Sequence, residues 1–152
     1  MNELPIVQFL YRRNQTINMM GEKTTEYALS EAADRTAKEI GFDLVDFSVY
    51  PNPDREPLGY DCFMEIKNRG EVLDLENVRK VLQKNMSEGN PSLGNKLDRG
   101  FMAPIRLMLL KQGAYQEYKN MMIERGTSGS QMKPIHVIIT EEQRDFFFAR
   151  VQ

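Results

Sequence analysis

The stretch LVDFSVYPNPDREPLGYDCFMEI, residues 44–66, contains two segments in which apolar and polar residues alternate. The apolar positions are Leu44, Val45, Phe47 and Val49 in the first segment and Tyr60, Cys62, Met64 and Ile66 in the second. Such alternation is typical of β-strands. The residues between them, Pro51-Asn52-Pro53-Asp54, favour a turn. The stretch therefore predicts a β-hairpin with a long loop.

Two amphipathic helices are predicted on either side of this hairpin. Residues 25–40 carry apolar side chains three to four positions apart, and Gly41 ends the pattern. Asp74 is a favourable N-cap for a second helix, which extends to about Met86. Residues 90–100, which follow, are predicted to be irregular.

The C-terminal part of the chain alternates between strand and helix signals. Residues 104–110 predict a strand, and residues 114–124 predict a helix that ends at Gly126. The apolar run 135–139 predicts the last strand. The pattern from Thr140 to Gln143 is a capping box, and it predicts a terminal helix with three consecutive phenylalanines.

The N-terminal residues predict a further hairpin. Ile6–Tyr11 and Thr16–Met20 are short apolar runs separated by polar residues. The complete order is then two strands, a helix, two strands, a helix, a strand, a helix, a strand and a helix. This order favours an α+β fold, a single small domain in which helices pack against a mainly antiparallel or mixed sheet.

Length and composition narrow the functional classes. With 152 residues the chain has room for one domain with one core, and a formal net charge of -2 provides no overall attraction to nucleic acid or a membrane surface. A single cysteine and a single histidine argue against disulfides and zinc sites. No signal-peptide pattern and no membrane-spanning apolar run is present. We therefore expect a cytoplasmic protein with no metal, nucleic-acid or membrane partner.

Lys133 is the first candidate functional residue. It lies in GTSGSQMKP, residues 126–134, where small residues let the backbone approach a ligand closely and the apolar run 136–139 anchors the far end. An ammonium group in this setting suits phosphate or carboxylate. The alternative is a solvated linker with an incidental lysine. The motifs of self-contained nucleotide or serine hydrolysis are absent from the chain.

Other candidates are also basic. Lys23 precedes the helix at 25–40, whose N-terminus attracts anions, although it could equally be an ordinary surface lysine. Arg12-Arg13 could hold a carboxylate or a neighbouring domain, or simply form a solvated turn. Cys62 is interpreted as a buried apolar filler. His136 has no partner that sequence can identify and is assigned a structural role.

Three long stretches together resemble one protein family. They are RRNQTINMMGEKTTE (12–26), LVDFSVYPNPDREPLGYDCFMEI (44–66) and APIRLMLLKQGAYQEYKNMMIERGTSGSQMKP (103–134). In this order and spacing they resemble the small C-terminal domain of the auxin-responsive-promoter family of acyl-acid amido synthetases, within the adenylate-forming superfamily. The resemblance extends from about Phe9 to Val137.

This resemblance implies a two-step reaction. Such enzymes use ATP to convert a carboxylic acid to an acyl adenylate, and an amine, typically of an amino acid, then attacks the acyl carbon to form an amide. A large N-terminal domain binds most of the acid, the ATP and Mg²⁺, and the small domain rotates over it as a lid. This sequence contains no such large domain. We therefore expect residues 1–152 to be a lid domain that is inactive alone and works with a large domain in cis or in trans.

The resemblance also implies roles for individual residues. Lys133, in Gln131-Met132-Lys133, matches the lysine that enters the active site. Lys23, in Glu22-Lys23-Thr24, matches a lysine that faces the nucleotide. The segment near the interdomain hinge matches Arg12, Arg13 and Asn14. The chain departs from the family at Met132, where a tyrosine is usual, and at Ile135-His136, where the family often has Pro-Arg.

Two other functional classes remain as alternatives. A non-catalytic module derived from this domain could bind a protein through its sheet or hairpin face. Single-stranded RNA binding through a sheet face would need basic and aromatic strands. The acidic balance and the absence of tryptophan weigh against RNA binding.

Overall fold

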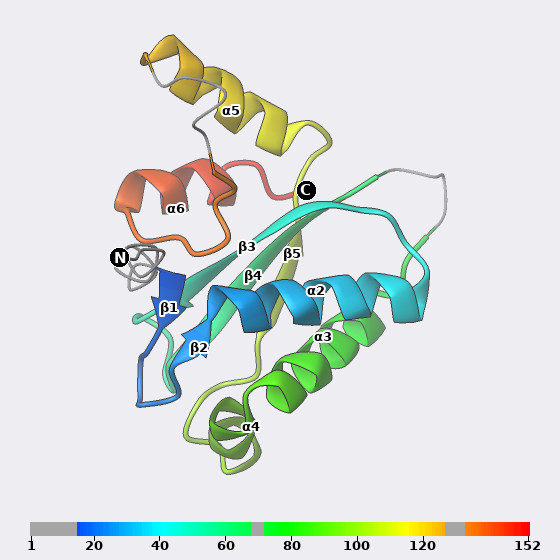
Figure 1. The fold of residues 1–152 in the computed structure, drawn as a ribbon, viewed down its shortest axis with the longest axis vertical. Helices are drawn as coiled ribbons and strands as arrows, with labels where there is room; N and C mark the ends of the chain where they lie inside the picture. The colour runs from blue at the N-terminus through cyan, green and yellow to red at the C-terminus, as the bar shows by residue number, and fades with distance from the viewer. Residues whose placement is uncertain (1–14, 68–71, 127–132) are drawn as a thin grey trace, which may run out of the picture.

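A three-stranded mixed sheet forms the centre of the molecule. A computed structural model describes residues 15–67, 72–126 and 133–152 (Figure 1). Strand β3 (Leu44–Asn52) pairs antiparallel with β4 (Gly59–Ile66), and β5 (Arg106–Leu109) pairs parallel with β4. The order is therefore β3-β4-β5. Every residue of β4 is buried, because helices cover both faces of this central strand. The predicted hairpin and mixed α+β fold are confirmed.

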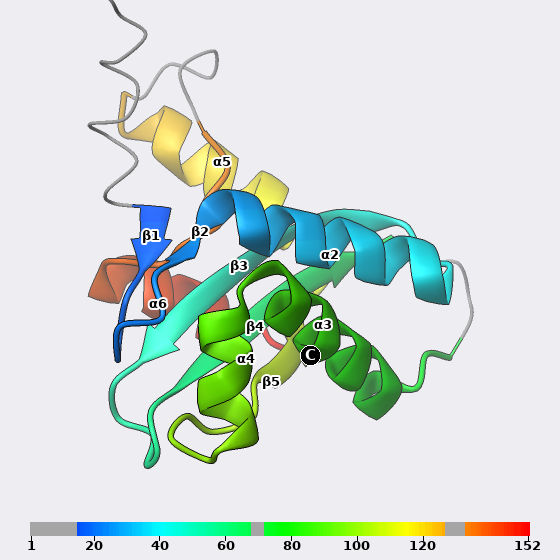
Figure 2. The same cartoon turned by 60° about the horizontal axis from the view of Figure 1, so that its bottom comes forward.

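Helices α2 (Glu26–Ile40) and α3 (Leu75–Gly89) cover one face of the sheet, where Figures 1 and 2 show them side by side. Their apolar stripes pack on alternate residues of β4, including Cys62 and Met64. Helix α3 begins at the predicted cap Asp74, and Gly41 ends α2 as predicted, with a φ angle of 94°. This left-handed conformation favours glycine. The buried Cys62 confirms its interpretation as an apolar filler.

Helices α5 (Ala114–Glu124) and α6 (Glu141–Phe148) cover the opposite face. Phe63 of β4 points to this side and packs with Tyr118, Phe146 and Phe147 in a second core. The capping box at Thr140 opens α6 as predicted. Helices therefore lie on both faces of the sheet. None of the helices in the described part of the chain combines the length and apolar character needed to cross a lipid bilayer.

A small second sheet precedes α2. Strand β1 (Thr16–Ile17) pairs antiparallel with β2 (Thr24–Thr25). The strand predicted over Thr16–Met20 is therefore shorter than expected, because the amides of its last residues bond to a side chain in the following turn. Its predicted partner, Ile6–Tyr11, lies outside the described residues.

The prediction of an irregular segment over residues 90–100 was wrong. Helix α4 (Pro91–Asp98) occupies most of it. The Asn90 side chain accepts a hydrogen bond from Leu93 N, and Pro91 stands in the first turn, where its missing N–H costs nothing. Gly94 lets α4 approach α3 closely, since a Cβ there would lie 3.0 Å from Cβ of Ser87. Asn90, Pro91 and Gly94 thus serve as the cap, the first residue and the contact point of this helix.

The strand predicted over residues 135–139 is reduced to one parallel bridge between Val49 and Val137. Two hydrogen bonds support it: Val49 N donates to His136 O at 2.8 Å and Ile138 N donates to Val49 O at 2.9 Å. The segment then turns into the cap of α6. It therefore lies along the free edge of β3 without joining the sheet over its full length.

Candidate functional site

Lys23 lies on the turn between β1 and β2, directly before α2. Its side chain is exposed, and its φ angle of 50° is uncommon for a residue other than glycine. The buried carboxylate of Glu22 holds this turn by accepting hydrogen bonds from Met19 N at 3.0 Å, Met20 N at 2.7 Å and the Tyr60 hydroxyl at 2.7 Å. The fold therefore fixes the backbone from which Lys23 projects.

Further hydrogen bonds tie the same turn to β4 and α4. The Thr24 hydroxyl lies 2.9 Å from that of Tyr60, and Asn90 Nδ2 donates to Glu22 O at 2.7 Å and to Thr24 Oγ1 at 2.9 Å. Burial raises the pKa of the Glu22 carboxyl, but its hydrogen bonds outweigh burial and leave that pKa below its ordinary value. Glu22 is thus an ionised internal anchor, and Lys23 carries the exposed charge of the turn.

The N-terminus of α2 is less open to an anion than its sequence suggests. Thr25 Oγ1 accepts a hydrogen bond from Ala28 N at 3.1 Å, which satisfies one free amide of the first turn. Glu26 places a carboxylate in the same turn. An anion at this end of the helix would therefore depend more on the ammonium of Lys23 than on the helix itself.

Lys133 is exposed and lines a cavity of about 330 Å³. The other walls come from β3, β4, α5 and the residues that follow Lys133; they include Val45, Asp46, Glu65, Tyr115, Lys119 and Ile135. Both signs of charge and two aromatic side chains therefore meet at this cavity. The predicted hinge residues Arg12, Arg13 and Asn14 lie outside the described residues, as do Gln131 and Met132.

His136 connects the Lys133 segment to two other elements. Its Nδ1 lies 2.7 Å from Glu26 Oε2 on α2, and its Nε2 lies 3.0 Å from Asp46 Oδ1 on β3. The ring stacks on Phe47, with centroids 4.3 Å apart and planes inclined by 9°. We call Glu26, Asp46 and His136 the histidine clasp. It confirms a structural role for His136, whereas its partners could not be predicted because no local pattern links residues so far apart in the chain.

The clasp brings the segments of the two candidate lysines together. Lys23 precedes Glu26 by three residues, and Lys133 precedes His136 by three. A chain extends at most about 3.6 Å per residue, so each lysine backbone lies within about 11 Å of its clasp residue. Residues separated by more than a hundred positions are thereby held at one side of the molecule.

Comparison with known proteins agrees with this architecture. The sequence profile described as the GH3 family C-terminal domain matches residues 27–142. The chain belongs to this family. The resemblance to the acyl-acid amido synthetases is thereby confirmed.

Full-length relatives are much longer than this GH3 domain. The chain is 24% identical over 144 residues to 4-substituted benzoates-glutamate ligase GH3.12 of Arabidopsis thaliana, an alignment that covers 87% of the chain and 25% of that protein. It is 27% identical over 121 residues to a human GH3 domain-containing protein, covering 76% of the chain and 22% of that protein. The chain thus spans about a quarter of these relatives.

A solved structure shows the same fold. The GH3.15 acyl acid amido synthetase superposes with a TM-score of 0.78 at 20% identity, over 90% of this chain and 26% of that one. A second structure of that type, in complex with 2,4-DB, gives a TM-score of 0.76 at 21% identity. The GH3 C-terminal fold is therefore established here.

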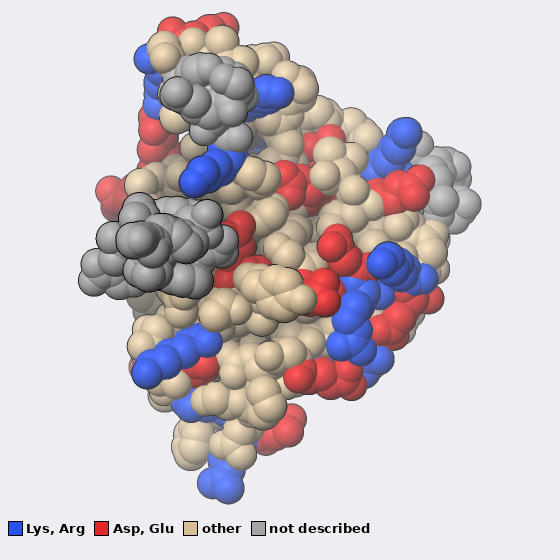
Figure 3. Space-filling model, in the orientation of Figure 1, with Lys and Arg blue, Asp and Glu red and all other residues tan. Residues whose placement is uncertain are grey.

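One face of this GH3 domain has mixed charge. On the face drawn in Figure 3, basic and acidic side chains are interspersed. Among the residues that the structure describes, no group of three or more His, Cys, Asp or Glu could hold a metal ion. Lys23 and Lys133 remain the exposed lysines for which the sequence predicts contact with an anion.

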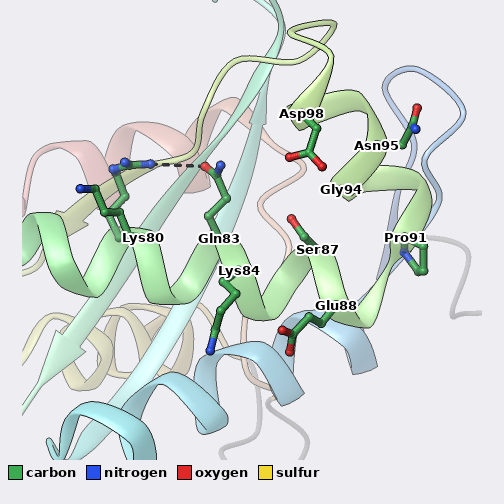
Figure 4. Close-up of a pocket in the computed structure, with 10 residues that line it drawn as sticks. Lys80, Gln83, Lys84, Ser87, Glu88, Pro91, Gly94, Asn95 and Asp98 are labelled. Carbon is green, nitrogen blue, oxygen red and sulfur yellow. Dashed lines mark hydrogen bonds between the residues drawn. The ribbon is translucent and has the colours of Figure 1, made fainter.

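A larger groove lies between α3 and α4 (Figure 4) and has a volume of about 580 Å³. Two of its charged side chains are paired: Lys84 lies 3.1 Å from Glu39, and Glu88 lies 2.9 Å from Arg35. Figure 4 shows Lys84 and Glu88 directed toward α2 and away from α4.

Proposed function

We propose that this GH3 C-terminal domain is the lid of an ATP-dependent acyl-acid amido synthetase. The observation that carries the proposal is the family match combined with two exposed lysines, Lys23 and Lys133, each three residues from the histidine clasp. Residues 1–152 act as one domain over a large N-terminal domain, supplied in cis or in trans. Alone, the domain is inactive, because the other walls of the site belong to the large domain.

Lys133 acts in the first half-reaction. A carboxylate oxygen attacks the α-phosphorus of ATP, the bond from that phosphorus to the bridging oxygen breaks, and pyrophosphate leaves. Two anions meet in this step, so a positioned ammonium offsets their repulsion and stabilises the charge that develops on the phosphates. The amine nitrogen then attacks the acyl carbon, the bond from that carbon to the phosphate oxygen breaks, AMP leaves, and the nitrogen loses a proton to solvent. Rotation of the lid withdraws Lys133 before that second step.

The remaining groups have supporting roles. Lys23 faces the nucleotide from a rigid turn, and Arg12, Arg13 and Asn14 form the interdomain hinge. Mg²⁺ and most of the ATP are bound by the large domain, as are the carboxylic acid and the amine. The reaction takes place in the cytoplasm and involves neither nucleic acid nor a membrane.

The test is Lys133→Ala in the complete enzyme. ATP–pyrophosphate exchange with a panel of aromatic and aliphatic acids should fall about a hundredfold or more, because one charge-stabilising group is lost. Amide formation from supplied acyl adenylate should be nearly unchanged. Lys119→Ala is the matched control, since Lys119 is an exposed lysine of the same cavity. It should leave both reactions intact.

Two outcomes would contradict the proposal. Equal losses in exchange and amide formation would remove the specific role of Lys133 in adenylation. Absence of exchange with every acid, in wild-type enzyme with a folded large domain, would favour the non-catalytic protein-binding module.

A further inference from the structure

We propose that His136 is a positioning residue for Lys133: as an imidazolium held between Glu26 and Asp46, it fixes the lysine-bearing segment to α2 and β3. This inference rests on the proposed role of Lys133 in adenylation. The three clasp side chains are each less than 30% exposed, at 16% for His136, 20% for Glu26 and 25% for Asp46. The clasp is therefore shielded from solvent on most of its surface.

The geometry of the clasp favours a doubly protonated ring. Both ring nitrogens face carboxylate oxygens, at 2.7 and 3.0 Å. A neutral imidazole has one donor and one acceptor nitrogen, so one nitrogen would confront a carboxylate without a proton between them. The imidazolium donates to both carboxylates. Stacking on Phe47 sets the plane of the ring and hence the direction of both hydrogen bonds.

The surroundings favour the charged ring. Burial lowers the pKa of His136, but hydrogen bonds and charge attraction from Asp46 and Glu26 outweigh burial and raise it above its ordinary value. Asp46 also lines the cavity that contains Glu65 of β4, Lys119 of α5 and Lys133. The two carboxylates in direct contact with the ring dominate over these more distant groups.

Only two residues separate the clasp from Lys133. Pro134 has a φ angle restricted by its ring, and Ile135 O accepts a hydrogen bond from the Ser48 hydroxyl. His136 O accepts a bond from Val49 N at 2.8 Å. These contacts fix the residues that follow Lys133. The position of His136 therefore sets the direction in which the chain presents the lysine.

The first test measures the clasp without any activity. His136 is the only histidine of the chain, so its ring signals in an NMR titration of the 152-residue protein are unambiguous. The ring should titrate above the ordinary histidine range, and Asp46→Asn should shift its midpoint down. Asp34→Asn, which removes an exposed carboxylate of α2, should leave the midpoint in place. An ordinary midpoint that is insensitive to Asp46→Asn would overturn the proposal.

The second test asks whether His136 acts through Lys133. In the complete enzyme, His136→Gln should lower ATP–pyrophosphate exchange about tenfold to a hundredfold, as expected for a misplaced catalytic group. In a Lys133→Ala background it should cause little further loss, because the positioned group is already gone. If the His136→Gln enzyme does not fold, Asp46→Asn provides the same test. It weakens the clasp by replacing a single oxygen atom of the side chain.

These tests separate the inference from the proposed function. If His136→Gln lowers ATP–pyrophosphate exchange by the same factor in the wild-type and Lys133→Ala enzymes, His136 does not act through Lys133. The proposed role of Lys133 would then still stand. An unaffected Lys133→Ala enzyme would overturn the proposed function, and with it positioning, whatever the titration shows. The inference would be supported if His136→Gln lowers exchange only when Lys133 is present and if Asp46→Asn shifts the titration midpoint of His136 down.

Discussion

At the scale of single residues, Glu22 is the anchor of the Lys23 turn. Replacing it by glutamine should lower the free energy of unfolding by about 1–3 kcal/mol at neutral pH, because hydrogen bonds to a buried charged group are weakened. The folded-state pKa of Glu22 lies below its ordinary value of 4.5. Its stabilisation is therefore present above that value and is lost as pH falls through the folded-state pKa. Denaturant unfolding followed by circular dichroism at neutral and acidic pH measures this difference.

Glu31→Gln provides the control, since Glu31 is an exposed carboxylate of α2. It should change stability by little at either pH. A Glu22→Gln penalty that stays constant into acid would show that shape, and not ionisation, accounts for the effect.

In this turn, one important residue could be predicted from the sequence and another could not. Lys23 could be chosen from its place before a helix. Glu22 gave no sign of its structural importance, because its partner Tyr60 lies on a strand that no local pattern connects to it. Likewise, His136 could be assigned a structural role, but Glu26 and Asp46 could not be named as its partners. Partners of this kind depend on tertiary packing.

At the scale of elements, Glu65 of β4 caps a helix on another part of the chain. The N-cap of α5 is Gly113, which has no side chain to satisfy free amides. Glu65 instead accepts hydrogen bonds from Gly113 N at 2.7 Å and Tyr115 N at 3.0 Å. Glu65→Gln should cost about 1–3 kcal/mol, because glutamine provides only one acceptor oxygen. Hydrogen exchange should accelerate in the first turn of α5.

Glu124→Gln, at the exposed end of the same helix, is the matched control and should leave exchange in that first turn unchanged. Unaltered exchange in Glu65→Gln would contradict the cap. Faster exchange throughout α2 and α5 alike would indicate general destabilisation instead.

Elements with their own caps and periodicity could be predicted from sequence. Helices α2, α3, α5 and α6 each combine an apolar pattern with a start or stop signal, and the β3–β4 hairpin combines alternation with a turn. Two segments could not be predicted. Helix α4 contains Pro91 and Gly94, whose favourable positions become apparent only from its packing on α3. Residues 135–139 have the composition of a strand, but α6 begins too soon for them to pair fully with β3.

At the scale of the whole molecule, β4 makes the two helical layers depend on each other. Its residues alternate between the α2–α3 core and the α5–α6 core, so loss of either layer would expose one face of the sheet. The lid that we propose needs this coupling if it is to rotate as a unit, since Lys23 precedes α2 and Lys133 follows α5. We therefore expect unfolding to be all-or-none across both layers.

Phe147→Ala tests this coupling. Phe147 is fully buried and contacts Phe63, Tyr115 and Tyr118, so its removal should cost about 3–5 kcal/mol. The slowest-exchanging amides of α2, in the opposite layer, should lose protection by the same free energy, because they exchange only when both layers open. Phe148 lies at a partly exposed position of the same helix. Phe148→Ala should therefore lower the protection of amides by a smaller free energy, and by the same amount in both layers. Faster exchange confined to α5 and α6 would instead show that the layer carrying Lys133 opens independently, and the two lysines would then not move as one body.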